Sequence, residues 1–317
     1  MTECVDIVMA TYNGMPYIRE QLQSILWQDY PQFRLLIHDD GSTDGTVEEI
    51  TKVAERYPDK VFFIEDGITF KDAKKNFEHL LKMTDADYIF LADQDDVWLP
   101  SKVSAMLKHI KNGEQQYGGM HKPILVFSDL SPIDKNGFPK STSMFKMENV
   151  NPRAVCLELL LSRNIIPGCV MGFNKSLLEV SFPFPNEAVM HDWWLALVAA
   201  ATGNILYVPK SLVLYRQHER NAIGVRDHTL KSSFLRLART PMNMLRRFSR
   251  LGQRAVKQAE TVFERLKDNE LLNDNTERIL RHYLEYRRGP LFKRVSYLRE
   301  FVRDNLIFEL VRCVLWN

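Results

Sequence analysis

The sequence is poor in cysteine and lacks the motifs that most often mark a phosphate-binding site. Its four cysteines, Cys4, Cys156, Cys169 and Cys313, are scattered through 317 residues without a CxxC pair or a metal-type spacing, which favours reduced, cytosolic thiols. Neither GxGxxG nor GxxxxGK[ST] occurs, so the dinucleotide-binding fingerprint and the P-loop are both absent from the sequence. A nucleotide would therefore need a different kind of site.

The sequence also lacks a long apolar run and a secretory leader. The longest strongly apolar stretch, residues 193–201, is about half the ~20 residues that cross a bilayer. The first residues, MTEC, pass directly into a strand pattern without a basic segment, an apolar segment or a cleavage site. We therefore expect a cytoplasmic protein whose contact with a membrane is peripheral.

Charge is distributed unevenly along a chain of otherwise ordinary globular composition, with 45% hydrophobic and 26% charged residues. Residues 1–225 hold 22 basic and 29 acidic side chains, a net charge of −7, whereas residues 226–317 hold 20 and 11, a net charge of +9. The split predicts two regions with different tasks. The basic region would attract an anionic surface such as phospholipid or, less specifically, nucleic acid; the alternative is a solvated helical face.

Short apolar runs alternate with segments of helical period over the first 130 residues. The helical segments include residues 17–27 and 46–57, and the apolar runs are Val5–Ala10, Phe33–Ile37, Val61–Ile64, Tyr88–Leu91 and Ile124–Phe127. This βαβα alternation predicts an α/β fold with a mostly parallel sheet between helices. Its ligand crevice should lie beyond the carboxyl ends of the strands.

Polar motifs follow three of these strands: ATYNG at 10–14, HDDGSTDGT at 38–46 and ADQDDVW at 92–98. In the last motif Asp93, Asp95 and Asp96 would repel one another, and Mg²⁺ or Mn²⁺ with oxygen ligands would relieve that repulsion. Such an ion brings a phosphate-bearing ligand within reach. The alternative is an acidic turn that caps a helix beginning near Leu99.

The second motif contains candidates for nucleotide recognition. Asp39 and Asp40 end the strand, Gly41 permits a tight turn, and Asp44 can cap the next helix. A carboxylate here could accept the N–H of a base or the hydroxyls of a ribose. A capped turn without a ligand is the alternative.

Residues 128–225 are richer in proline, glycine and aromatics, and we interpret them as the second half of the cleft. In MHDWWLA at 190–196, His191 opens an apolar helix and Asp192 lies at its N-terminus beside Trp193 and Trp194. Asp192 could act as a general base in a partly desolvated pocket, with the indoles stacking on a sugar. A helix-capping carboxylate is the alternative.

The C-terminal region is predicted to be helical and amphipathic. Arg246, Arg250, Arg254 and Lys257 form a basic stripe, and apolar faces recur at Leu230, Phe234 and Leu237 and again from Leu306 to Leu315, followed by Trp316. Three roles remain open for these helices: packing on the core, lying in a membrane interface, or forming a homodimer.

Taken in order, VMATYNG, HDDGSTDGT, ADQDDVW and MHDWW resemble the inverting family 2 glycosyltransferases over roughly residues 5–222. The resemblance implies a GT-A, Rossmann-like domain at residues 1–225, followed by the helical region 226–317. It also implies a nucleotide-sugar donor, Mn²⁺ or Mg²⁺, and transfer with inversion at the anomeric carbon. ADQDDVW and YRQHERNAIG are most similar to bacterial rhamnosyltransferases of O-antigen and capsule synthesis, which act on lipid-linked acceptors at the cytoplasmic face of the membrane.

Residue by residue, the resemblance assigns Asp192 as the catalytic base and Asp95, with Asp93 and His218, as metal ligands. The nucleotide and donor contacts that it implies are Thr11, Tyr12, Asn13, Asp39, Asp40, Asn76, Asp93, Gln94 and Asp96. Lys74 and Lys75 are secondary candidates for the donor. The acceptor and sugar pocket that it implies consists of Trp98, Gly168, Cys169, His191, Trp193 and Trp194.

Several alternatives stay open at this point. Uracil and thymine present nearly the same edge to Asp39, so the donor could be a UDP-sugar or dTDP-rhamnose, and a glucosyl-, galactosyl- or N-acetylhexosaminyltransferase fits equally. A non-catalytic nucleotide-sugar-binding protein is less consistent with an intact DxD element together with Asp192. A nucleotidyltransferase would not explain HDDGSTDGT and MHDWW together. Specific nucleic-acid binding lacks an aromatic platform, a zinc-finger spacing or a helix-turn-helix.

Overall fold

The computed structural model describes residues 3–219 and 242–289. Within them, eight strands form one sheet in the order β3-β2-β1-β4-β7-β6-β8-β5. Their bounds are β1 (Val5–Thr11), β2 (Phe33–Asp39), β3 (Val61–Ile64), β4 (Tyr88–Ala92), β5 (Val97–Trp98), β6 (Ile124–Asp134), β7 (Met171–Asn174) and β8 (Asn204–Gln217).

The sheet has a parallel half and a mixed half. Strands β3, β2, β1 and β4 are parallel neighbours, as the βαβα pattern predicts. Strand β7 then runs antiparallel to both β4 and β6, β8 pairs parallel with β6, and β5 pairs antiparallel with β8. The expected α/β fold with a mostly parallel sheet is confirmed, with a mixed edge that the sequence pattern did not predict.

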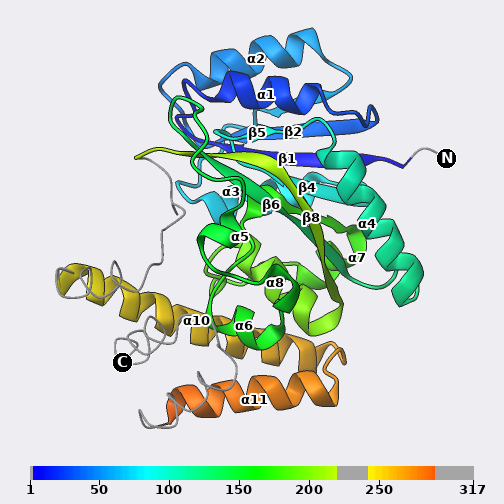
Figure 1. The fold of residues 1–317 in the computed structure, drawn as a ribbon, viewed down its shortest axis with the longest axis vertical. Coiled ribbons are helices and arrows are strands. Elements are labelled where there is room, and N and C mark those ends of the chain that lie inside the picture. The colour runs from blue at the N-terminus through cyan, green and yellow to red at the C-terminus, as the bar shows by residue number, and fades with distance from the viewer. Residues whose placement is uncertain (1–2, 220–241, 290–317) are drawn as a thin grey trace.

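Helices cover both faces of this sheet. Their bounds are α1 (Ile18–Leu26), α2 (Thr46–Arg56), α3 (Ala73–Met83), α4 (Lys102–Tyr117), α5 (Met144–Met147), α6 (Leu157–Ser162), α7 (Lys175–Ser181), α8 (His191–Thr202), α10 (Met242–Asp268) and α11 (Asp274–Arg288), with single 3₁₀ turns η1 (Pro152–Ala154) and η2 (Gly168–Val170). Figure 1 shows α1 and α2 above the sheet and α3 and α8 below it. Because both faces are covered, the parallel strands are apolar at nearly every position.

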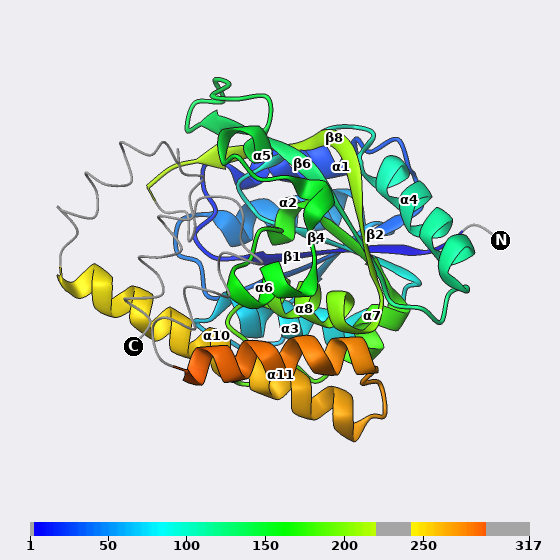
Figure 2. The same cartoon turned by 60° about the horizontal axis from the view of Figure 1, so that its bottom comes forward.

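The two long C-terminal helices form a further layer. In both views α10 and α11 lie side by side beneath α6 and α8 (Figures 1 and 2). Helix α10 buries Ala255, Ala259, Val262 and Leu266, and Gln258 Oε1 accepts a 2.7 Å hydrogen bond from the Val189 amide. Of the roles left open for this region, the apolar face of α10 thus performs packing on the core.

The basic stripe is oriented differently from this apolar face. Arg250 and Lys257 are exposed, and the exposed Arg254 donates to the Val189 carbonyl at 3.3 Å. The side chain of Arg246, the apolar runs at 230–237 and 306–316, and the boundary between residues 225 and 226 lie outside the described residues. In the described part of the chain, no helix combines the length and apolar character needed to span a bilayer.

Candidate functional site

The polar segments that follow β1 and β4 meet at a cavity of about 1250 Å³. Five of the residues predicted to contact the donor or a metal border it: Tyr12, Asn13, Gln94, Asp95 and His218. They come from three distant parts of the chain, which the sheet brings together at the carboxyl ends of its strands, where open α/β sheets bind ligands. This geometry agrees with the predicted location of the ligand crevice, beyond the carboxyl ends of the strands.

Hydrogen bonds between loops shape the floor of the cavity. The Gln94 side chain pairs with the backbone of Tyr12, accepting from its amide at 2.8 Å and donating to its carbonyl at 2.9 Å. Asn13, at φ 48°, accepts from the Thr43 amide at 2.9 Å, and its own amide donates to Ser42 Oγ at 2.7 Å. The ring of Tyr12 is left 58% exposed and is available to stack on a planar ligand.

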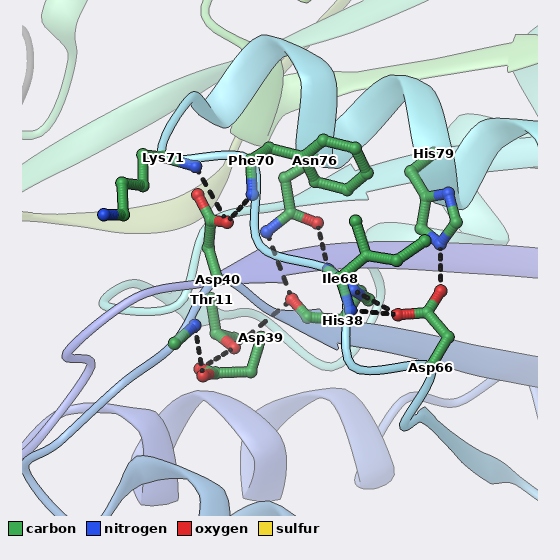
Figure 3. Close-up of polar contacts among 11 residues, drawn as sticks. Thr11, His38, Asp39, Asp40, Asp66, Ile68, Phe70, Lys71, Asn76 and His79 are labelled. Atoms are coloured by element: carbon green, nitrogen blue, oxygen red, sulfur yellow. Dashed lines mark hydrogen bonds and ion pairs between the residues drawn. The ribbon is translucent and has the colours of Figure 1, made fainter.

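Asp39 and Thr11 are buried and bonded to each other rather than open to the cavity. Asp39 Oδ2 accepts from Thr11 Oγ1 at 2.7 Å (Figure 3). The same oxygen accepts from Ser42 Oγ at 2.6 Å, while Oδ1 accepts from the amides of Gly41 and Ser42. The Thr11 side chain thus faces Asp39 rather than the cavity, and the expectation that it lines the nucleotide pocket stays a prediction. Asp39 organises the turn in this structure, and its contact with a base stays a prediction.

Asp40 has a similar task on the other side of the turn. Its carboxylate accepts from the backbone amides of Phe70, Lys71 at 3.0 Å and Asp72 at 3.1 Å, so it fixes the loop that leads into α3. Asp40 therefore holds the loop beside the turn, as Figure 3 shows.

The structure places Asn76 against His38 rather than at the cavity, and its contact with the donor stays a prediction. Asn76 is buried in α3, with Oδ1 2.8 Å from His38 Nδ1 and Nδ2 3.3 Å from the His38 carbonyl. Lys74 is also buried, and its ammonium donates to the carbonyls of Asn186 and Ala188 at 3.1 and 2.9 Å. Both side chains fill polar positions inside the fold, whereas Lys75 is exposed.

Asp95 and His218 are the predicted metal ligands that meet at the cavity. Asp95 Oδ2 lies 2.8 Å from His218 Nε2, and both side chains are partly accessible, at 15% and 12%. The His218 ring stacks on Tyr17 with 4.9 Å between centroids, which holds Nε2 toward the carboxylate. A carboxylate oxygen and an imidazole nitrogen at the edge of an open cavity fit Mn²⁺ well, and Mg²⁺ through the carboxylate.

Arg216 contacts the backbone of Asp95 and so helps to hold the pair of Asp95 and His218 in place. Its guanidinium donates to the Asp95 carbonyl at 3.0 Å and to Glu20 at 2.6 Å, and it lies 4.9 Å over the ring of Tyr17. Its backbone amide donates to Asp96 Oδ1 at 3.1 Å. Arg216 lies in YRQH, two positions before His218. The end of β8 therefore places both Arg216 and His218 against the acidic motif ADQDDVW.

Asp93 and Asp96 form a second acidic group with Cys169, in which Asp96 and Cys169 are buried and Asp93 is half-buried. Their ligand atoms all lie within 4.8 Å of one another. Burial, followed by the charge of Asp95, raises the pKa of both Asp93 and Asp96. Asp96 is fully buried, and its Oδ2 finds no N–H or O–H donor among the described residues. Because burial and the neighbouring carboxylates disfavour its ionised form, Asp96 would be stabilised either by a bound proton or by a cation close by.

Lys102 supplies a cation on the inner side of that group. Its ammonium donates to the Cys169 carbonyl at 2.7 Å and lies 3.1 Å from the centroid of the Trp98 ring. Burial lowers the pKa of Lys102 to about 7, while Asp96 and Asp93 favour its charged form. Because the last two residues of ADQDDVW form β5 and α4 begins at Lys102 with Ser101 as its N-cap, the motif does not cap the helix, and that alternative is wrong.

Asp192 lies close to the acidic motif, although it comes from α8. Its charge contributes to the raised pKa of Asp93, after burial and Asp95. The carboxylate is buried and accepts from the amides of Trp193 at 2.6 Å and Gly168 at 3.2 Å. Burial raises the pKa of Asp192 to about 6. The helix cap is Met190, so Asp192 is a first-turn carboxylate tuned toward neutral pH rather than a capping residue.

The tryptophans predicted to line a sugar pocket are packed in the core, and their contact with a sugar stays a prediction. Trp194 is fully buried with its N–H bonded to the Ser181 carbonyl at 2.9 Å, and the N–H of Trp193 donates to the Leu160 carbonyl at 2.6 Å. Trp98 is 2% exposed. In this structure the faces of all three indoles are covered by the core, so none is open to a ligand.

His191, Gly168 and Cys169 are also buried but lie nearer to Asp192. His191 stacks on Phe77 with 3.9 Å between centroids, and burial lowers its pKa to about 3, so the ring is neutral. A Cβ at Gly168 would stand 3.0 Å from His191 Nε2, so any other residue there would require the imidazole to shift by a few tenths of an ångström. The three residues thus shape the wall behind the base; their contact with an acceptor stays a prediction.

Sequence reasoning missed Lys102 and Arg216 as members of the site. Lys102 lies four residues before Met106, on the buried stripe of α4, and a lysine on an apolar stripe is a signal for a buried cation. Arg216 is part of a motif that we singled out for His218. Neither signal identifies the group that the residue contacts, because Lys102 donates to the Cys169 carbonyl and the Arg216 amide donates to Asp96, 67 and 120 residues away in the chain.

Comparison with known proteins agrees with this geometry. The model of the family "Glycosyl transferase family 2" matches residues 6–174. A dTDP-rhamnosyl transferase of Shigella flexneri, RfbG, is 30% identical over 241 residues, which cover 72% of this chain and 78% of that protein.

Solved structures match over nearly the whole chain. A mannosyltransferase of Pyrobaculum calidifontis in complex with GDP-Man and Mn²⁺ has a TM-score of 0.56 at 18% identity, covering 98% of this chain and 85% of that one. Residues 1–349 of S. aureus TarS, in complex with UDP-GlcNAc, give a TM-score of 0.56 at 15% identity, covering 98% and 89%. These likenesses concern the fold. With the family match and the RfbG identity, they show that the chain belongs to glycosyl transferase family 2 and is a glycosyltransferase with the GT-A fold.

Proposed function

We propose that the protein is an inverting, metal-dependent transferase that moves a sugar, best assigned as rhamnose, from a nucleoside diphosphate to a hydroxyl group. The observation that carries the proposal is the position of Asp192. Its buried carboxylate, with a pKa raised to about 6, approaches the acidic motif from a different segment of the chain. A base in that position can deprotonate a hydroxyl while the donor diphosphate is held at Asp95.

In the proposed reaction, Asp192 takes the proton of the acceptor hydroxyl. The acceptor oxygen forms its bond to the anomeric carbon as the bond from that carbon to the diphosphate oxygen breaks, so the configuration is inverted. When bound, Mn²⁺ or Mg²⁺ would neutralise the charge that develops on the departing diphosphate. Asp95 and His218 would hold the ion, and Arg216 keeps the backbone of Asp95 in place.

The donor is proposed to be dTDP-rhamnose, with a UDP-sugar as the alternative. The 30% identity to a dTDP-rhamnosyl transferase supports the first, and the exposed ring of Tyr12 offers a surface on which either base can stack. We expect metal-dependent release of nucleoside diphosphate when the purified protein is incubated with dTDP-rhamnose, and much slower release with UDP-glucose, UDP-galactose or UDP-N-acetylglucosamine. The rate with each donor is measured with and without EDTA. Faster release from another donor would overturn the rhamnose assignment.

The acceptor is proposed to be a lipid-linked glycan of bacterial surface polysaccharide synthesis, reached at the cytoplasmic face of the membrane. The exposed Arg250 and Lys257 of α10 support attraction to anionic lipid. Each basic residue near such a surface contributes about 1 kcal/mol, so Arg250→Glu with Lys257→Glu should weaken vesicle binding about 30-fold or more. Charge reversal is preferred to truncation because removing α10 would uncover the core beneath it.

Sedimentation with vesicles of anionic and of neutral phospholipid measures this effect. The matched control is Lys52→Glu with Arg56→Glu, a pair of exposed basic residues on α2, on the far side of the sheet from α10 (Figure 1). The control should bind anionic vesicles nearly as well as the unmodified protein. Equal loss in both variants would mean that net charge, and not the α10 surface, governs the attraction.

A further inference from the structure

A second group of metal-ligating side chains lies beside the turn that carries Asp39 and Asp40. It consists of His38 at the end of β2, Asp66 in the loop after β3 and His79 in α3 (Figure 3). Asp66 Oδ1 is 3.2 Å from His38 Nε2, and Asp66 Oδ2 is 2.6 Å from His79 Nε2. These three residues do not border the cavity that contains Asp95 and His218, so the two groups are separate.

Asn76 determines which nitrogen of His38 carries its proton. The Asn76 amide nitrogen donates to the His38 carbonyl at 3.3 Å, which turns Asn76 Oδ1 toward His38 Nδ1 at 2.8 Å. Because an amide oxygen only accepts, Nδ1 must be the protonated nitrogen. In the neutral ring, Nε2 then presents its lone pair to the carboxylate of Asp66. Two acceptors facing each other at 3.2 Å repel, and a cation between them removes the repulsion.

We propose that His38 Nε2, Asp66 and His79 Nε2 bind one divalent transition-metal ion, for which Zn²⁺ is the best match. Two imidazoles and one carboxylate form a typical zinc donor set, and a hydrogen-bonded second nitrogen, like Nδ1 of His38, is the usual support of a zinc-binding histidine. Neighbouring ligand atoms in a tetrahedral zinc site are roughly 3.3 Å apart, so small rotations of Asp66 and His79 suffice. The side chains of Asp66 and His79 are 26% and 17% exposed, which leaves access for the ion and a water ligand.

The ion would stabilise the turn that carries Asp39 and Asp40. It would join β2, the loop after β3 and α3 at one point, directly before Asp39 and Asp40 in the chain. Asp66 already accepts from the Ile68 amide at 3.0 Å, and Asp40 holds the same loop three residues further on. Binding would therefore order the loop at residues 66–72 from its other end, whatever sugar or metal the transferase site uses.

Metal content tests the proposal without reference to activity. The full-length Asp95→Ala variant, which lacks a ligand of the other site, is stripped with EDTA and dialysed against buffered Zn²⁺. Bound zinc per chain is then measured by mass spectrometry, and affinity by chelator competition. We expect one Zn²⁺ per chain. Adding His79→Gln or Asp66→Asn should weaken binding by about 100-fold or more, since each removes a direct ligand and even indirect support is worth 10–100-fold.

The matched control is His121→Gln, which replaces an exposed histidine outside the cluster and should leave zinc binding unchanged. Thermal unfolding of each stripped variant verifies that it is folded, and the Asp66→Asn variant keeps an oxygen that can accept from the Ile68 amide. Tetrahedral Co²⁺ gives a visible absorption band that provides a second readout. The proposal would be overturned if the Asp95→Ala protein bound less than one Zn²⁺ per chain, or if the His79→Gln variant kept full affinity for zinc. The carboxylate of Asp66 would then be paired with protonated nitrogens and not with a metal ion.

Discussion

Replacement of Asp192 by Asn is expected to lower kcat by about 10²- to 10⁴-fold, the usual worth of general acid–base catalysis, with little change in donor affinity. The amide preserves the shape of the carboxylate and can still accept from the amide of Gly168, but it cannot take a proton from the acceptor. Steady-state kinetics with donor and acceptor measure kcat, and calorimetry with the nucleoside diphosphate measures binding. The matched control, Glu187→Gln, removes an exposed carboxylate from the segment that leads into α8 and should retain full turnover.

The pH profile provides a check that a purely structural role would fail. Since Asp192 must be ionised to act as a base and its pKa is raised to about 6, kcat/KM should fall about tenfold per pH unit below that value. The residual activity of the Asp192→Asn variant, measured from pH 5 to 8, should lack this acidic limb. An unchanged profile or unchanged turnover would exclude Asp192 as the base.

The same substitution should also make the protein more stable at neutral pH. The folded-state pKa of Asp192, about 6, lies above that of an unfolded aspartate, so ionisation opposes folding increasingly as the pH rises from about 4 to about 6, and fully above that range. At 1.36 kcal/mol per pKa unit the free energy of unfolding should rise by up to about 3 kcal/mol at pH 8, and the gain should vanish below about pH 4. Denaturant titration at the two pH values measures it. A loss of stability would show that the carboxylate has a structural role.

Replacement of Asp95 by Ala is expected to reduce turnover by about 10³-fold, because the charge stabilisation supplied by a catalytic metal is worth several kcal/mol. Among the carboxylates of ADQDDVW, the structure places Asp95 at the border of the cavity, where its Oδ2 faces His218 Nε2. Donor affinity in Asp95→Ala should become nearly independent of Mn²⁺, whereas in the unmodified protein it should increase with the metal. Calorimetric titration of the nucleoside diphosphate with Mn²⁺ and with EDTA measures both.

Glu219→Ala is the matched control for this prediction. Glu219 is an exposed carboxylate that borders the same cavity, one residue after His218. If the cavity merely attracts cations through its net charge, both substitutions should reduce the effect of Mn²⁺ similarly. Donor affinity that is identical with and without metal in the unmodified protein would remove the metal-binding role altogether.

The sequence alone determined the parallel half of the sheet and the position of the cleft. Strands β1, β2, β3 and β4 lie between layers of helices, so each is a continuous apolar run, and the polar motifs after β1, β2 and β4 mark the carboxyl ends of those strands. The start of α8 at His191 follows from the change to helical apolar spacing. These are local patterns, readable from consecutive residues.

Only the tertiary structure decided the mixed edge and the direction of individual side chains. Strand β7 is a four-residue strand whose Gly172 leaves space for the Phe90 ring, 2.6 Å from where a Cβ would stand, and its partners are about 45 and 85 residues away in the chain. Asn76 and Trp194 have the residue types of a binding site, yet they face His38 and the Ser181 carbonyl. Spacing along a helix gives the face of a residue but not the partner packed against it, because that partner comes from a distant segment placed by the whole fold.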